Sequence, residues 1–260
     1  MEILEPAGGP ANIERVASGG ADFCLTSVTH YLRARARSGD LAARFVSVVV
    51  RRSPMSAMVA ADSALTTPLD LAGLRLGGPA DSGLVAEFLA GMADLGMVAP
   101  VLVPLDYALA PAAMGRGEVD MVCDFVDLLP RVRLQSGVAV RAVPLGLDVY
   151  SSGLVAADRL SDGTVSCMQN AMAAALESQR ADPRAGLPEL ARRYPDADPV
   201  DALEGWFLAE PNIFTGPPPG WSDPGTWART IVQLAAAHGL PAPDPVTVYR
   251  PAVPEVSPSR

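Results

Sequence analysis

Three short stretches of the sequence place glycines or hydroxyl groups where a helix is expected to begin. A helix N-terminus offers free backbone N–H groups and the positive end of the helix dipole, so it attracts anions and polar groups. Each hydroxyl can also be an ordinary helix cap. Because ligands of open α/β sheets bind beyond the carboxyl ends of the strands, we predict that the three stretches meet in one ligand-binding cleft. The residues are Gly8, Gly9, Thr26, Ser27, Asp81, Ser82 and Gly83.

Three further residues are candidates for the same cleft. Asp124 and Phe125 end an apolar run, and Tyr150 precedes another. A carboxylate there could bind an amine or a ring N–H, although a solvated loop is the simpler interpretation of Asp124. The two aromatic rings could stack on a ligand.

The case for catalysis from the sequence is weak. Cys24 and His30 lie six residues apart and are the only pair in which a nucleophile could sit beside a base. The chain has no lysine, which excludes a Schiff base with pyridoxal phosphate and a phosphate-binding Walker lysine. Neither a G-x-S-x-G nor an H-E-x-x-H pattern is present. His238 precedes a glycine at an expected helix end, where its charge would complement the dipole.

The composition narrows the classes of partner and cofactor. Three widely spaced cysteines and two histidines predict neither a disulfide framework nor a metal site, and we expect no cofactor. A net charge of −9 argues against nucleic acid as a partner. No window of about 18 apolar residues predicts a membrane span. The first residues, "MEILEPAGGP", show no signal peptide pattern.

Strand-like and helix-like runs alternate along residues 12–158, which predicts an α/β fold with mainly parallel sheets. From residue 163 the pattern is helical, and the Pro-rich stretch 240–260 is expected to be loosely held. Two strings recur. "SGGADFCLTS" (18–27) is followed 98 residues later by "RGEVDMVCDF" (116–125), and "SAMVAAD" (56–62) is followed 96 residues later by "SGLVAAD" (152–158). Two repeats at nearly one offset predict a duplicated lobe.

Five segments, in this order, resemble one protein family: "VASGGADFCLTSVTHYLRA", "TTPLDLAGLRLGGPADSGLVAEFLAGMADLG", "AMGRGEVDMVCDF", "SSGLVAADRL" and "AALESQRADPRAGLPELARRYP". The chain resembles the SsuA/THI5-like (NMT1-like) substrate-binding proteins of ABC transporters, over residues 2–240. The resemblance implies the type 2 periplasmic-binding fold, an α/β architecture of two lobes joined by a two-strand hinge. It implies lobe 1 at 1–66 and 150–250, lobe 2 at 67–149 and a flexible tail at 251–260. The ligand-contacting positions of the family map onto Gly8-Gly9, Thr26-Ser27, Ser82-Gly83 and the stretch near Asp124.

The chain departs from the family at its first residues. Family members begin with a strand and a helix before the part that matches here, so we expect lobe 1 to lack both. The family is exported, to the periplasm or as a lipid-anchored extracellular protein, whereas an authentic start at Met1 would imply a cytoplasmic protein. The cysteine-rich motif of the THI5-type pyrimidine synthases is absent.

Two functional hypotheses follow. The first is a solute-binding protein that captures a small polar or anionic organic molecule and delivers it to an ABC transporter permease. A sulfonate, nitrate, a pyrimidine precursor or an aromatic acid would be such a molecule. The alternative is a cytosolic enzyme on the same fold, a lyase, desulfinase or biosynthetic enzyme that acts on a small acid and uses Cys24. The weak catalytic pattern favours the first hypothesis.

Overall fold

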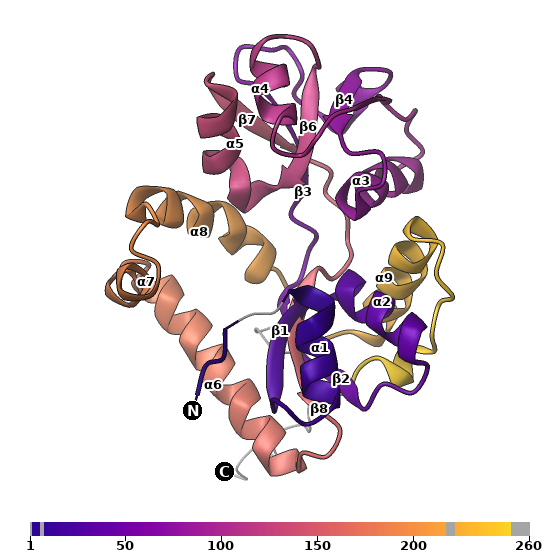
Figure 1. Ribbon diagram of the computed structural model, residues 1–260, viewed down its shortest axis with the longest axis vertical. Helices are drawn as coiled ribbons and strands as arrows, with labels where there is room; N and C mark the ends of the chain where they lie inside the picture. Colours follow the sequence, from indigo (N-terminus) through magenta and orange to yellow (C-terminus); the bar gives the residue numbers. More distant parts are fainter. Residues whose placement is uncertain (1, 6–7, 217–221, 251–260) are drawn as a thin grey trace.

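In the computed structural model, which describes residues 2–5, 8–216 and 222–250, the strands form two sheets (Figure 1). The smaller sheet has the order β1-β8-β2, and β8 is antiparallel to both neighbours. Its strands are β1 (Phe23–Ser27), β2 (Ala43–Val50) and β8 (Ser152–Ala157). We call this sheet and the helices packed on it lobe 1.

The larger sheet has the order β5-β4-β6-β3-β7 and forms lobe 2 with its helices. β4 is parallel to β5 and β6, whereas β3 is antiparallel to β6 and β7. Its strands are β3 (Met55–Ala60), β4 (Arg75–Gly78), β5 (Val101–Pro104), β6 (Met121–Phe125) and β7 (Val140–Pro144).

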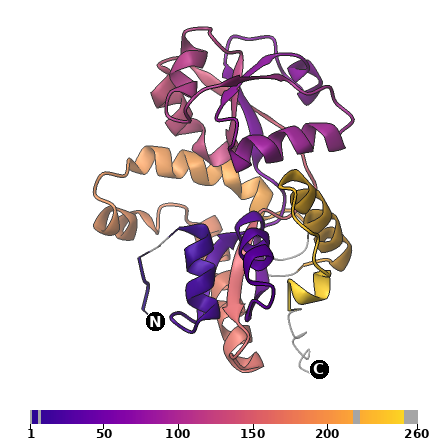
Figure 2. The same cartoon turned by 45° about the vertical axis from the view of Figure 1, so that its right-hand side comes forward.

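Amphipathic helices cover the sheets. Lobe 1 carries α1 (Gly9–Ala17), α2 (Val28–Ser38), α6 (Asp162–Ala181) and α9 (Pro224–Ala237). Lobe 2 carries α3 (Gly83–Asp94), α4 (Ala110–Gly115) and α5 (Leu129–Ser136). From α6 the chain runs through α7 (Leu187–Arg193) into α8 (Pro199–Ile213), which lies between the lobes on one side of the molecule (Figures 1 and 2). The short 3-10 helices are Pro68–Leu71 (η1), Val126–Leu128 (η2) and Pro245–Thr247 (η3).

Each lobe has its own apolar core. In lobe 1, the rings of Tyr31, Phe45 and Trp227 pack in sequence, and Tyr249 stacks on Trp227 with ring centroids 5.3 Å apart. In lobe 2, Phe88 and Met92 of α3 pack on the buried strands of the larger sheet. The cores are separate, so the segments that cross between the sheets and the residues at the lobe interface set how the lobes face each other.

The predicted fold class is confirmed, and two details of the prediction are wrong. The sheets are not mainly parallel, because β8 and β3 each run antiparallel between two neighbours. The boundary does not fall at residue 66, because β3 belongs to the larger sheet. The chain therefore crosses between the sheets at residues 51–54 and 145–151, which correspond to the two expected hinge segments.

The sequence repeat corresponds to equivalent elements. β1 lies 98 residues before β6, and β8 and β3, which carry the second repeated string, pair with them antiparallel. In lobe 2, β4 pairs with the other side of β6. Among the described residues no strand takes that place beside β1, so β1 is an edge strand and Leu25 is 56% exposed.

The Pro-rich stretch 240–260 was expected to be loosely held, and for the described residues up to 250 this expectation is wrong. Val248 and Tyr249 are buried, and Tyr249 forms a parallel bridge with Phe45. The tail 251–260 lies outside the described residues. Within the described part of the chain, every helix is too short or too polar to cross a membrane.

Candidate functional site

A cavity of about 250 Å³ lies between the lobes. Lobe 1 contributes residues of α2, of the chain just before β8 and of α9, and lobe 2 contributes residues of α3 and the end of β6. Ser53 of the first crossing segment also lines the cavity. The lining residues are Ser27, Thr29, His30, Arg33, Ser53, Gly83, Leu84, Glu87, Phe125, Val149, Tyr150, Ser151 and Leu234.

One face of α2 forms the polar wall of the cavity. Ser27 caps this helix, and its hydroxyl accepts a hydrogen bond from the His30 backbone N–H at 3.1 Å. Thr29 and Arg33 lie one turn apart on the same face, as positions i and i+4 do. The cap fixes where the helix begins and therefore which side chains point into the cavity.

A chain of hydrogen bonds joins the lobes beside this wall. Arg33 Nη2 donates to His238 Nδ1 at 3.0 Å, and His238 Nε2 lies 3.0 Å from Glu87 Oε1. A guanidinium has no acceptor, so Nδ1 must accept and Nε2–H donates to the carboxylate. Thr29 Oγ1 also donates to Glu87 Oε1, at 2.8 Å. Glu87 belongs to lobe 2 and its partners to lobe 1, so these bonds hold the lobes together.

Two glycines allow the close contacts around this chain. A Cβ at Gly83, the first residue of α3, would lie 2.8 Å from Arg33 Nη2 and 3.2 Å from His238 Cε1. A Cβ at Gly9 would lie 2.0 Å from His30 Nδ1. A larger residue at Gly83 would displace the end of Arg33, and one at Gly9 would displace the ring of His30, so both would disturb the polar wall.

The surroundings of His30 disfavour its protonated form. Burial lowers its pKa below the usual 6.5, and the positive charge of Arg33 lowers the pKa further, while Glu87 acts in the opposite direction. Besides His30, the cavity is lined by one basic side chain, Arg33, and one acidic side chain, Glu87.

The remaining wall is largely apolar. Leu84, Val149, Leu234 and Phe125 line it, together with the ring of Tyr150. The Tyr150 hydroxyl accepts a hydrogen bond from the Asp223 backbone N–H at 2.7 Å, which fixes the ring. The arrangement combines two opposite charges with an apolar surface, as small-molecule sites commonly do.

Four of the predicted ligand-binding residues line this cavity: Ser27, Gly83, Phe125 and Tyr150. The others lie outside its lining. Gly8 and Ser82 cap helices, Gly9 supports His30, and Asp81 is exposed in a turn. Thr26 is buried in β1, and its hydroxyl has no partner among the described residues.

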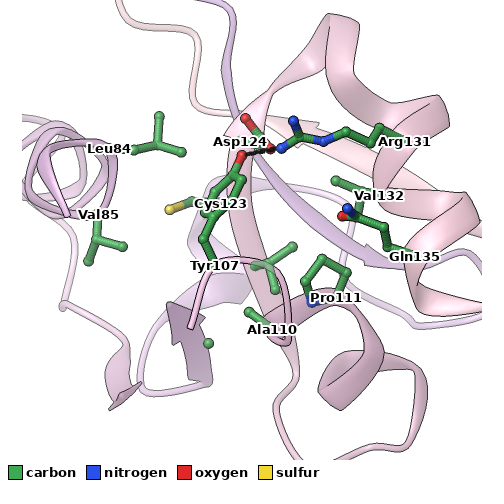
Figure 3. A pocket seen from close by; sticks show the side chains of 12 residues that line it. Leu84, Val85, Tyr107, Ala110, Pro111, Cys123, Asp124, Arg131, Val132 and Gln135 are labelled. Carbon is green, nitrogen blue, oxygen red and sulfur yellow. Dashed lines mark hydrogen bonds and ion pairs between the residues drawn. The ribbon is translucent and has the colours of Figure 1, made fainter. Parts of the chain in front are cut away.

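Asp124 lies within lobe 2, in a separate pocket shown in Figure 3. Its carboxylate accepts hydrogen bonds from the Tyr107 hydroxyl and from the Phe125 backbone N–H, and Arg131 lies 3.4 Å away. Burial raises the pKa of Asp124 despite these partners. The pocket has a volume of about 10 Å³, room for one water molecule at most. This geometry therefore does not favour the predicted role of Asp124 in binding a ligand in the cleft.

The pair of Cys24 and His30 is divided between two environments. His30 lines the cavity, whereas Cys24 packs against the core of lobe 1. Burial raises the pKa of the Cys24 thiol to about 11, so it carries almost no thiolate at neutral pH. This environment does not suit a nucleophile.

Thr29, Arg33, Glu87 and His238 are the functional candidates that the sequence prediction missed. The expected role of His238, a charge at a helix end, is incomplete, because its ring bonds to two other helices. The spacing of Thr29 and Arg33 from the Ser27 cap was an available signal. Nothing in the local sequence indicated that Glu87, 151 residues before His238, would contact it.

A family model described as NMT1/THI5 like matches residues 1–185. No curated protein sequence matches the chain. Solved structures with the same fold include the alkanesulfonate-binding protein SsuA of Xanthomonas axonopodis pv. citri bound to MOPS, with a TM-score of 0.62 and 20% identity. That match covers 95% of this chain and 86% of the other.

The periplasmic aliphatic sulphonate binding protein SsuA of Escherichia coli matches with a TM-score of 0.68 and 18% identity, covering 97% of this chain and 83% of the other. The ligand-binding component of an ABC-type import system of Staphylococcus aureus matches with a TM-score of 0.62 and 12% identity, covering 96% and 85%. At these identities the similarity establishes the fold.

Proposed function

Because the chain belongs to the NMT1/THI5-like family, we propose that it is a solute-binding protein that captures a small polar or anionic organic molecule between its lobes. The observation that carries this proposal is the cavity of about 250 Å³ lined from both lobes. This volume is below the ~300–1,000 Å³ typical of sites for drug-sized ligands, so it suits a smaller molecule.

The crossing segments 51–54 and 145–151 act as the hinge in this proposal. The lobes close when Glu87 reaches Thr29 and His238, and a ligand would be enclosed by the same movement. The partner is an ABC transporter permease, and the protein works outside the cytoplasmic membrane. Two proteins of the same fold, the periplasmic sulphonate-binding protein of Escherichia coli and the import-system component of Staphylococcus aureus, support both statements.

Binding can be tested by thermal shift with alkanesulfonates, nitrate, pyrimidines, aromatic acids and small amino acids. A ligand at 100 times its Kd stabilises the folded state by about 2.7 kcal/mol, and the melting temperature rises accordingly. Ser151→Phe fills the cavity and should abolish the shift. Ser178→Phe, on the exposed side of α6, is the matched control and should keep it. If no compound raises the melting temperature of the wild-type protein, the proposal is wrong.

A further inference from the structure

Arg33 and Glu87 line the same cavity and keep hydrogen-bonding atoms free. Arg33 uses only Nη2, which bonds to His238, so Nε and Nη1 have no partner among the described residues. Both hydrogen bonds to Glu87 end on Oε1, which leaves Oε2 without a donor in the described part of the chain. The cavity thus presents a free cationic edge and a free anionic oxygen.

These two charges are held apart. Among the described residues no ion pair joins Arg33 to Glu87, and His238 lies between them with Nδ1 facing one and Nε2 facing the other. His238 is almost fully buried, with 3% of its side chain exposed, and Glu87 has 17% exposed. Charges removed from water are costly unless an opposite charge satisfies them. A ligand that carries both signs can satisfy both groups at once.

The rest of the lining fits a short apolar spacer. Leu84, Val149 and Leu234 also line the cavity, and their side chains offer no hydrogen bond to a ligand. A small molecule with charged ends and a hydrocarbon middle matches this distribution of polar and apolar surface.

Resting on the proposed function, we propose that the ligand is a small zwitterion. Its anionic group binds the free edge of Arg33, and its ammonium group binds Glu87 Oε2. Glu87 is then the residue that selects amine-bearing acids over simple acids, and because it also bonds to Thr29 and His238, selection takes place in the closed state.

The experiment measures affinity by isothermal titration calorimetry for glycine, β-alanine and 4-aminobutyrate. Each is compared with the acid that lacks the amine and with the amine that lacks the acid. At the preferred chain length, the wild-type protein should bind the amino acid at least tenfold more tightly than either partial compound.

Glu87→Gln is the decisive variant, because glutamine keeps one oxygen acceptor for Thr29 and His238 and replaces the anionic Oε2 with an NH2 group, which cannot accept a hydrogen bond from an ammonium group. It should lower the preference for the amino acid over the simple acid at least tenfold. Arg33→Gln should lower the preference over the simple amine. Glu118→Gln, an exposed glutamate paired with Arg116, is the matched control and should leave both preferences unchanged.

The inference is overturned if the wild-type protein binds a simple acid as tightly as the amino acid, if it binds none of these compounds, or if Glu87→Gln keeps the wild-type preference. These results are distinguishable from failure of the proposed function, which requires that every compound of the broader thermal-shift set fails to bind.

Discussion

At the scale of single residues, burial sets the chemistry of the three cysteines. Cys24 packs on the core of lobe 1, Cys123 is buried in β6, and Cys167 is exposed on α6. Burial raises the pKa of Cys24 to about 11 and that of Cys123 to about 12. A thiol in such an environment is a packing group, so the enzymatic alternative based on Cys24 has no support from its surroundings.

We predict that iodoacetamide at pH 8 modifies Cys167 first. For Cys24, a pKa of about 11 in place of 9.0 leaves about a hundredfold less thiolate at this pH than in an unfolded chain. Labelling of Cys24 in the folded protein should therefore be at least about a hundredfold slower than in the unfolded protein, by the same thiolate argument. Its rate should rise about tenfold per pH unit, because the thiolate fraction grows with pH until the pKa is reached. Mass spectrometry of labelled peptides gives the three rates, and unfolded protein is the control. Rapid labelling of Cys24 at pH 7 would contradict this and revive the enzyme hypothesis.

At the scale of elements, glycines decide how closely helices approach. Gly115 ends α4, and a Cβ there would lie 2.0 Å from the Ser136 carbonyl oxygen at the end of α5. The obstacle is backbone, so no side-chain rotation can relieve the clash. The contact between α4 and α5 over one face of the larger sheet therefore requires glycine at this position.

Gly115→Ala should destabilise the protein by about 1–3 kcal/mol, the usual cost of overpacking. Gly163→Ala is the matched control. Gly163 lies in the first turn of α6, where a Cβ would approach only Ser161 Oγ, at 4.0 Å, and alanine favours the helix. Urea denaturation measures both. Equal stability of the two variants would show that α4 and α5 can separate at little cost.

Some of these elements could be predicted from the sequence, whereas the direction of their strands could not. The Ser27 and Ser82 caps and the 98-residue repeat identified α2, α3, β1 and β6 from the sequence. Strand direction was not predictable, because the alternation of helices and strands is also compatible with a chain that crosses between two sheets. Only the pairing of β8 and β3 with their neighbours shows that both run antiparallel.

At the scale of the whole molecule, lobe 2 is held on two sides. On one side Glu87 bonds to α2 and His238. On the other side α8 packs on η2 and α5, where Arg133 and Glu204 form two hydrogen bonds of 3.0 and 2.6 Å. Leu208 of α8 packs against the core of lobe 2. The pair Arg133–Glu204 is partly exposed and contributes at most about 1 kcal/mol.

We predict that Gly205→Leu separates α8 from lobe 2, because even a Cβ at Gly205 would lie 2.9 Å from the Asp127 carbonyl oxygen. Overpacking of this kind lowers the free energy of unfolding by about 1–3 kcal/mol, so the melting temperature should fall by several degrees. The calorimetric transition should also broaden or split, because lobe 2 loses one of its two attachments. Gly163→Leu at the exposed start of α6 is the control. A wild-type transition for Gly205→Leu would show that α8 does not couple the lobes.

The sequence by itself determined the class of fold, the duplication and the starts of the main helices, because periodicity, caps and turns act over a few residues. Only the tertiary structure decided which side chains share the cavity. Thr29 and Glu87 are 58 residues apart and meet because the two lobes close on each other, whereas Arg33 and His238 are 205 apart and meet within lobe 1, where α9 packs beside α2. Ser27, Gly83, Phe125 and Tyr150 were predictable because each lies near the end of a helix or strand. Arg33, Glu87 and His238 were not, because no local pattern encodes a contact between residues so far apart in the sequence.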